Sequence, residues 1–286
     1  MKNKSHAHHI VVLTGAGIST TAGIPDFRGP DGVWTKHPEQ MNVYDIDEFL
    51  GNTEARKYSW RWQKESPVWN ARPGSAHKAL VTLEHAGLLS LLATQNFDAL
   101  HEKAGNSPDI IVNLHGTIAT SHCMRCHAPY KTAEIMAHLD ENSDPHCTKP
   151  RRATASHAGS TSHDISTPHD ISTPHDMSTP HDGSTSCDGL IKTDVTYFGE
   201  ALPEGAIERC VQALLTADEL WVIGSTLEVF PAASLVPLAA RIGLPITIMN
   251  LGATQYDYLA SRTIHEDIAV ALPQLVDTTI SRFASV

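Results

Sequence analysis

Two glycines near the start of the chain have the spacing that a phosphate-binding turn needs. Gly15 and Gly17 form a G-x-G directly after the apolar run HIVVL. Glycines there let backbone N–H groups approach a pyrophosphate at the start of a helix. In the dehydrogenase fingerprint G-x-G-x-x-G, the third glycine would stand at position 20, where this chain has Thr20. The fingerprint also expects a ribose-binding Asp or Glu about 20 residues further on, and here the loop PDFRGPDGVW occupies that place. The turn therefore favours a dinucleotide site of another kind than that of an ordinary dehydrogenase.

Polar residues follow two further apolar runs. The stretch TQNFDALH places Gln95, Asn96 and Asp98 after one predicted strand, and NLHGT places His115 at the end of the next. The carboxyl edge of a parallel sheet is the usual ligand crevice. A histidine with an ordinary pKa near 6.5 can act there as a general base. From this motif alone, a loop histidine without a catalytic role fits equally well.

Alternating strand and helix patterns surround these motifs. Strand signals recur at HIVVL, LLSLLAT, DIIVNL, DVTYF, ELWVIG and PITIMNL, and helical patterns at 45–50, 54–65, 75–87, 204–216, 232–242 and 265–283. Most of the strands are apolar on both faces, as in a parallel sheet that helices cover. The pattern predicts one domain over residues 1–286, of the α/β class, with a doubly wound parallel (Rossmann-like) sheet. We expect 19–22 to begin a helix and the stretch from Ile24 to Gln40 to be a loop.

Residues 117–193 interrupt the alternation. This region holds four of the five cysteines and almost no strand or helix period, so we expect a small inserted module. Inside it, 157–186 contains the repeat HDISTP, HDISTP, HDMSTP, HDGSTS. Its polar composition favours a disordered spacer, because it buries too little surface to offset the entropy of ordering. A histidine-rich metal reservoir is the alternative.

Composition excludes several classes of function. The 286 residues are 41% hydrophobic and carry a net charge of -11, which gives no basic surface for nucleic acid but suits a partner that presents lysines. The apolar run at the N-terminus is too short for a signal peptide, and no run approaches a membrane span. We therefore expect a cytoplasmic protein with no membrane partner, whose cysteines are reduced or bound to metal.

Taken together, these segments resemble the bacterial-type members of the sirtuin family of NAD-dependent protein deacylases. The similar stretches are GAGISTTAGIPDFRGPDGVW, TQNFDALH, LHGT, CMRC with a later CDGLIK, TYFGEALP, GSTLEVFP and MNLGAT, in the family's order and over nearly the whole chain. The family's G-A-G-x-S pattern has no third glycine at this spacing. The chain departs from the family at Phe97 and Ala99, where the family usually has Ile and Gly. It also reads GST at 224–226, where the family usually has GTS.

The resemblance implies NAD as cofactor and the transfer of an acyl group from lysine to ADP-ribose, with release of nicotinamide. His115 would be the base that activates a ribose hydroxyl, and Asn96 would hold the ribose and a bound water. The implied cofactor-binding residues are Gly15, Ala16, Gly17, Ser19, Ile24, Asp26, Phe27, Arg28, Gln95, Asn96, Asp98, Gly224, Ser225, Thr226, Asn250, Leu251, Gly252 and Ile268. Phe27 would shield the reactive sugar from water, and Ile24 and Asp98 would hold the nicotinamide carboxamide.

The same resemblance implies acyl-lysine proteins or peptides as substrates. Phe198 would wall the acyl-lysine channel, while segments near Gly199 and Val229 would clasp the peptide by strand addition. Tyr58 and Arg61 have the Tyr-x-x-Arg spacing with which some sirtuins bind succinyl or malonyl groups, and an arginine fork suits a buried carboxylate. An amphipathic helix with Trp60 and Trp62 in the core explains this stretch equally well.

The cysteines predict one structural zinc ion. Cys123 and Cys126 form a C-x-x-C knuckle, Cys147 follows, and Cys187 matches the family's closing C-x-G-x-I-K after thirty-nine intervening residues. Lengthening that loop from about 2 to about 39 residues costs roughly 2.6 kcal/mol, whereas a structural zinc returns on the order of 10 to 16 kcal/mol. We therefore expect a closed tetrahedral site that is not catalytic. His127 or His146 could replace a cysteine, and Cys210 is expected to be a small buried apolar residue.

Deacetylation is the first expectation for activity, and three alternatives stay open. They are removal of succinyl or malonyl groups, NAD-dependent protein ADP-ribosylation, and a non-catalytic sensor of NAD or of metal.

Overall fold

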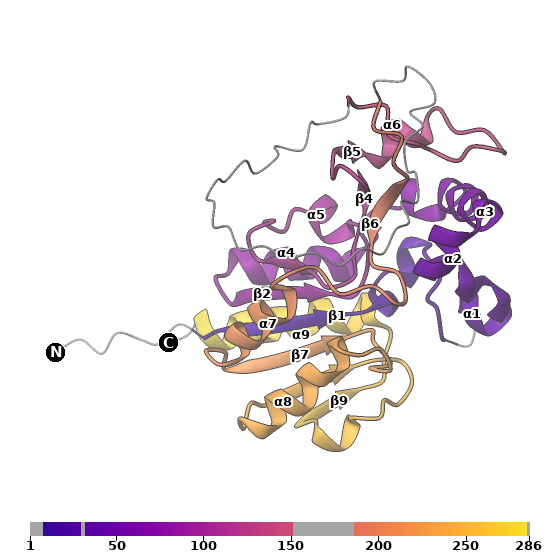
Figure 1. Ribbon diagram of the computed structural model, residues 1–286. Coiled ribbons are helices and arrows are strands. Elements are labelled where there is room, and N and C mark those ends of the chain that lie inside the picture. Colours follow the sequence, from indigo (N-terminus) through magenta and orange to yellow (C-terminus); the bar gives the residue numbers. More distant parts are fainter. Residues whose placement is uncertain (1–7, 30–31, 151–185, 285–286) are drawn as a thin grey trace, which may run out of the picture.

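The computed structural model describes residues 8–29, 32–150 and 186–284, and two sheets organise them. The repeat predicted at 157–186 lies, except for its last residue, outside the described residues. The larger sheet has the order β3-β2-β1-β7-β8-β9, and all neighbouring strands are parallel. Its strands are β1 (Ile10–Thr14), β2 (Leu89–Thr94), β3 (Ile111–Asn113), β7 (Glu219–Ile223), β8 (Ile246–Met249) and β9 (Arg262–Ile264). The predicted doubly wound α/β fold is confirmed (Figure 1).

Helices cover both faces of this sheet, which explains why its central strands are apolar throughout. In β1, Ile10 and Val12 pack toward α4 (Ser75–His85) and α9 (Ile268–Ala284). Val11 and Leu13 point the other way, toward α7 (Ala206–Leu214) and α8 (Leu235–Arg241). Such two-sided burial is typical of a parallel sheet inside a doubly wound domain. Within the described residues, no helix is both long and apolar enough to cross a membrane.

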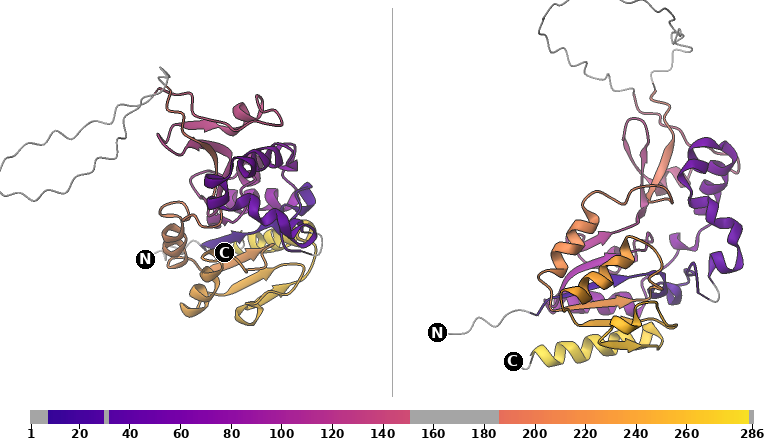
Figure 2. Two further views of the ribbon diagram at one scale, coloured as in Figure 1. Left: turned by 45° about the vertical axis from the view of Figure 1, so that its right-hand side comes forward. Right: turned by 60° about the horizontal axis from the view of Figure 1, so that its bottom comes forward.

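The smaller sheet is antiparallel and has the order β5-β4-β6. Its strands are β4 (Gly116–Cys123), β5 (Pro129–Lys131) and β6 (Ile191–Val195), and the short helix α6 (Thr132–Met136) follows β5. Figure 2 shows it at one end of the molecule, away from α9. The expectation that 117–193 has almost no strands was wrong, and so was the assignment of DVTYF to the parallel sheet. Strand β6 pairs with β4, which lies far away in the sequence. The local pattern of apolar residues does not reveal such a distant partner, which explains both errors.

Four further helices complete the described fold: α1 (Val33–Lys36), α2 (Ile46–Gly51) and α3 (Thr53–Lys64), which lie together at one side of the molecule, and α5 (Leu100–Ala104), which lies beside α4 (Figure 1). The 3-10 turns occupy Ala16–Ile18, Thr20–Ala22, Pro38–Tyr44, Pro67–Trp69, Ala232–Ser234 and Asp257–Leu259. The stretch expected to be a loop after Ile24 therefore contains α1 and a 3-10 turn. Asp45 and Asn52 start α2 and α3, because each side chain accepts two backbone N–H groups of the first turn.

Candidate active site

A cavity of about 510 Å³ opens at the carboxyl edge of the large sheet, where β1 lies beside β7. The strand order reverses its direction there, which is where ligands of doubly wound folds bind. Sixteen of the predicted site residues line the cavity: Gly15, Ala16, Gly17, Asp26, Phe27, Arg28, Gln95, Asn96, His115, Phe198, Gly199, Gly224, Ser225, Thr226, Val229 and Asn250. Motifs that lie up to 235 positions apart in the sequence (250 − 15) thus converge on one pocket.

Two glycine turns meet at the floor of this cavity. A Cβ atom on Gly15 would lie 2.6 Å from the carbonyl oxygen of Gly224, and one on Gly17 would lie 2.8 Å from the Cα of Gly224. Gly224 has a φ of 66°, in the left-handed region that favours glycine. The turns after β1 and β7 can pack this closely only without side chains. They leave a backbone-lined surface of the kind that holds a dinucleotide phosphate.

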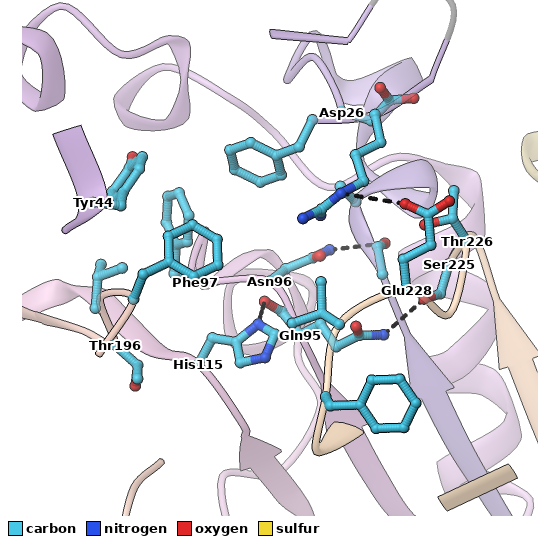
Figure 3. Close-up of a pocket in the computed structure, with 18 of the residues that line it drawn as sticks. Asp26, Tyr44, Gln95, Asn96, Phe97, His115, Thr196, Ser225, Thr226 and Glu228 are labelled. Carbon is cyan, nitrogen blue, oxygen red and sulfur yellow. Dashed lines mark hydrogen bonds and ion pairs between the residues drawn. The ribbon is translucent and has the colours of Figure 1, made fainter. Parts of the chain in front are cut away.

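His115 is oriented by a backbone carbonyl (Figure 3). Its Nδ1 lies 2.9 Å from the carbonyl oxygen of Gln95, so the neutral ring carries its proton on Nδ1. The lone pair on Nε2 is then available toward the pocket. Burial lowers the pKa of His115, the Gln95 carbonyl opposes that shift, and the positive charge of Arg28 adds to it. The imidazole is therefore neutral at pH 7, as a general base must be.

Two amide side chains stand beside His115. Asn96 Nδ2 donates to the carbonyl oxygen of Gly15 at 3.1 Å and to Ser19 Oγ at 3.3 Å, which leaves Asn96 Oδ1 as an acceptor. Gln95 Nε2 donates to Ser225 Oγ at 2.9 Å and so connects the ends of β2 and β7. These contacts hold both amides in one orientation, because each fixes which end of the amide donates.

A buried carboxylate lies beneath the pocket. Ser19 Oγ donates to Asp98 Oδ2 at 2.7 Å, and the backbone N–H of Leu100 donates to Oδ1 at 2.9 Å. Burial raises the pKa of Asp98, although both hydrogen bonds favour its charged form. The predicted residues Ser19 and Asp98 are thus in contact with each other, but they lie just behind the cavity lining.

Sequence reasoning missed two histidines behind Asp98. His77 Nε2 lies 3.4 Å from Ser19 Oγ, and His101 Nε2 lies 3.0 Å from the hydroxyl of Thr14. Burial lowers the pKa of His77 to about 4 and that of His101 to about 3. Both lie on the buried faces of their helices, so the signal in the sequence was a histidine at an otherwise apolar position.

Arg28 belongs to the loop that covers the pocket. Its Nε lies 3.3 Å from Glu228 Oε2, the ion pair that is dashed at Glu228 in Figure 3. Its guanidinium carbon lies 4.5 Å from the centre of the Trp34 ring. Burial lowers the pKa of Arg28, and the charge of Glu228 opposes that shift. Arg28 is the one permanent cation among the described residues that line the cavity.

One end of the cavity is aromatic. The ring of Phe97 lies 6.0 Å from that of Phe27 and 5.8 Å from that of Tyr44, and Phe198 lies 5.7 Å from Trp34. All five rings line the cavity. Phe97, at which the chain departs from the pattern it resembles, thus contributes directly to an apolar compartment near His115. That compartment suits an uncharged acyl chain.

The remaining predicted residues lie outside the cavity lining. Ile24 packs beside the aromatic end, Ile268 is the buried first residue of α9, and Leu251 and Gly252 are exposed next to Asn250. Tyr58 and Arg61 lie on the outer side of α3, with the Arg61 guanidinium 5.5 Å from the centre of the Tyr58 ring. Of the tryptophans in the alternative explanation of that helix, Trp60 is fully buried and Trp62 is half-buried.

The four expected cysteines meet in the small module. The sulfur atoms of Cys123, Cys126, Cys147 and Cys187 lie within 4.8 Å of one another, with Cys123 to Cys187 at 3.7 Å and Cys126 to Cys147 at 3.6 Å. Four sulfurs about 2.3 Å from a tetrahedral zinc are about 3.8 Å apart, so the cluster fits that ion. His146 pairs with Asp188 instead of joining the cluster, and Cys210 is a buried residue of the large core.

The fold and the pocket define a doubly wound protein of the dinucleotide-binding class, with a small module whose four cysteines fit a zinc ion. The Sir2 family model matches residues 15–231. The NAD-dependent protein deacetylase of Thermotoga maritima is 33% identical over 260 residues, which covers 90% of this chain and 88% of the relative. NAD-dependent protein deacetylase 2 of Streptomyces coelicolor is 31% identical, with 93% and 96% covered.

Solved structures agree with these relatives. A Sir2 variant with a deacetylated p53 peptide and 3'-O-acetyl ADP ribose is 32% identical, has a TM-score of 0.75, and matches 95% of this chain and 94% of its own. A Sir2 enzyme bound to a propionylated peptide has a TM-score of 0.71 at 31% identity, with 95% and 93% covered. The chain belongs to the Sir2 family.

Proposed function

We propose that this protein is an NAD-dependent protein-lysine deacetylase. The observation that carries the proposal is His115, whose Nδ1 is held by the Gln95 carbonyl and whose Nε2 is therefore a free base beside Asn96. Family membership supports it, because the relatives named above are NAD-dependent protein deacetylases. NAD would supply the ADP-ribose that accepts the acyl group and the nicotinamide that leaves.

The chain's own residues have separable tasks in this proposal. The glycine turns after β1 and β7 would hold the phosphates of NAD, with Arg28 as their counter-charge. Asp98, supported by Ser19, would accept from the carboxamide of nicotinamide. His115 Nε2 would take the proton of a hydroxyl brought within hydrogen-bond reach. Phe27 and the other rings would exclude water from the reacting groups.

The lining favours uncharged acyl groups over acidic ones. Beside the aromatic end, the cation among the described lining residues is Arg28, which stacks on Trp34 and is already paired with Glu228, while Tyr58 and Arg61 lie outside the lining. A succinyl carboxylate there would lose its hydration without gaining a charged partner of its own. Acetyl is therefore the first choice, and succinyl or malonyl remains the alternative to be measured against it.

The proposal includes acyl-lysine proteins as partners and a cytoplasmic setting, with no nucleic acid or membrane. The net charge of -11 supports lysine-bearing partners, and five unpaired cysteines are consistent with a reducing compartment.

The test is turnover of matched peptides. The purified protein is incubated with NAD and either an acetyl-lysine or a succinyl-lysine peptide, and nicotinamide and acyl-ADP-ribose are followed by mass spectrometry. We expect acetyl-ADP-ribose from the wild type and from His85→Ala, a control at an exposed histidine, but none from His115→Ala. Faster succinyl turnover would reverse the acyl preference. Label transferred from NAD to protein without deacylation would favour ADP-ribosylation, and NAD binding without turnover would favour a sensor.

A further inference from the structure

Helix α3 has one buried face that touches both the cysteine cluster and the pocket wall. Arg56, Ser59, Trp60 and Gln63 recur at helical spacing and are all buried, whereas Tyr58 and Arg61 on the other side are exposed. In Figures 1 and 2 the helix lies directly beside the small module. A helix this amphipathic normally buries apolar residues, so three polar residues on its buried face need partners.

The first part of this face is bound to the segment that leads to Cys147. Arg56 Nε donates to Asp144 Oδ1 at 3.0 Å and Nη2 donates to Oδ2 at 2.8 Å, which makes a bidentate pair between residues 88 positions apart. Arg56 also donates to the carbonyl oxygens of Phe49 and Leu50 at the end of α2. Next along the face, Trp60 packs among Cys123, Cys147 and Cys187.

The second part of the face holds a tyrosine of the pocket wall. Gln63 Nε2 donates to Tyr197 Oη at 3.1 Å and to Ser59 Oγ at 3.1 Å, while Ser59 Oγ and Tyr197 Oη are 3.0 Å apart. Tyr197 lines the cavity and precedes Phe198, which lines it too. Burial raises the pKa of Tyr197 to about 12, so its hydroxyl stays protonated.

The cofactor side of the pocket is held by other means. Gly15 N–H donates to the Ile223 carbonyl and Gly17 N–H to the Gly224 carbonyl, each at 2.9 Å. These contacts join the ends of β1 and β7 through backbone groups alone and involve no residue of α3. A displacement of α3 should therefore move Tyr197 and Phe198 without moving the glycine turns.

We propose that Arg56 and Asp144 are positioning residues for the acyl-lysine substrate. Through α3 and its contact with Tyr197, they set where the acyl-lysine wall of the pocket lies relative to His115. The pair fixes the helix to the cysteine-bearing segment, and Ser59 and Gln63 pass that placement on to Tyr197. Affinity for the acylated peptide then depends on a pair that touches neither peptide nor NAD. This inference rests on the proposed deacylase function.

The test separates peptide affinity from cofactor affinity. Asp144→Asn breaks the ion pair at the cysteine end, and Gln63→Leu breaks the link at the Tyr197 end. For each variant we would measure zinc content, NAD affinity by calorimetry without peptide, the binding of a fluorescent acetyl-lysine peptide, and kcat and KM. We expect stoichiometric zinc, unchanged NAD affinity, little change in kcat, and peptide KM and Kd raised about five- to tenfold, as for residues in one network.

The double variant and two controls make the result decisive. Asp144→Asn with Gln63→Leu should weaken the peptide little more than either change alone, because both cut the same connection. Glu141→Gln, at an exposed residue three positions before Asp144, should change nothing. Arg56→Lys keeps the charge but loses the fork, and its melting temperature shows whether a loss of folding explains the effect. Additive effects, an equal loss of NAD affinity, or an unchanged peptide Kd would overturn the proposal.

The outcome is distinguishable from failure of the proposed function. A wild type that binds the acetyl-lysine peptide but does not turn it over contradicts the deacetylase proposal, whereas the peptide Kd of each variant still tests the positioning role.

Discussion

A single backbone contact prepares His115 for its task. The Gln95 carbonyl can only accept a hydrogen bond, so it fixes the proton on Nδ1 and leaves Nε2 as the base. Its hydrogen bond also raises the pKa of His115, whereas burial and the charge of Arg28 lower it. Burial is the largest of these three effects, so the pKa is lowered on balance. The side chain is thus kept neutral in a pocket whose lining also includes the cation Arg28.

The pH dependence of turnover should show this balance. Since the pKa of His115 is lowered from its ordinary value of 6.5, the acidic limb of kcat at saturating NAD and peptide should be centred below pH 6.5. A pH series of initial rates measures it. An acidic limb centred at or above pH 6.5 would contradict the assigned environment.

At the scale of elements, the start of α5 carries backbone strain. Ala99 has a φ of 56°, in the left-handed region, although it is not glycine. A side chain there costs roughly 1–2 kcal/mol, whereas glycine costs about 0.4–1 kcal/mol through the entropy of the unfolded chain. The turn between Asp98 and α5 therefore holds Ala99 in a backbone conformation that alanine does not favour.

Ala99→Gly should therefore raise the free energy of unfolding, by about 1 kcal/mol. Urea denaturation followed by circular dichroism measures it. The matched control is Ala213→Gly in α7, where the backbone is helical and glycine should cost about 1 kcal/mol. A loss of stability in Ala99→Gly would mean that the side chain contributes more by packing than its backbone strain costs.

The stability of the small antiparallel sheet should depend on the cysteine cluster that joins its strands. Cys187 enters the cluster directly before β6, and its sulfur lies 3.7 Å from that of Cys123 at the end of β4. Cys187→Ser should abolish stoichiometric zinc and lower the melting temperature, because a closed site needs all four thiolates. Metal analysis by mass spectrometry measures it, with Cys210→Ser as the control outside the cluster. Undiminished zinc would remove Cys187 from the site.

Part of this architecture is predictable from the sequence. The glycine turn, Asn96, His115 and the four cysteines were found because short motifs preserve their spacing. The wrong assignment of DVTYF and the unpredicted strand β9 have a common cause, since short strands are specified by distant partners rather than by local pattern. The pair of Arg56 and Asp144 was out of reach for the same reason: nothing near either residue indicates a partner 88 positions away.

Across the whole molecule, two buried histidines link folding to pH. The ring of His77 in α4 lies 5.1 Å from that of His101 in α5, with the two planes tilted by 54°, and burial lowers their pKa values to about 4 and about 3. In the unfolded chain the same rings bind protons near pH 6.5. Between pH 6.5 and 4 the unfolded state therefore binds more protons than the fold, and acid favours unfolding.

As the pH drops from 6.5, the free energy of unfolding should accordingly decrease by roughly 1.4 kcal/mol per pH unit for each histidine. Above pH 6.5 the contribution of both rings to stability is complete. Urea titrations at pH 7, 6 and 5 measure the slope. His77→Gln should flatten it, while His85→Gln at the exposed end of α4 should leave it unchanged. A slope that is the same in His77→Gln and wild type would contradict the role of the buried ring.

The ends of the segment between Cys147 and Cys187 lie side by side. Cys147 N–H donates to the Gly189 carbonyl at 2.8 Å, Cys187 N–H donates to the Lys149 carbonyl at 2.8 Å, and Pro150 forms a bridge with Ser186. The chain thus leaves and re-enters the module through one short ladder, whose closing energy changes only with the logarithm of the length between. This junction is therefore a suitable site for inserting another domain. A reporter domain whose own termini lie close together could be spliced there with little effect on the catalytic fold.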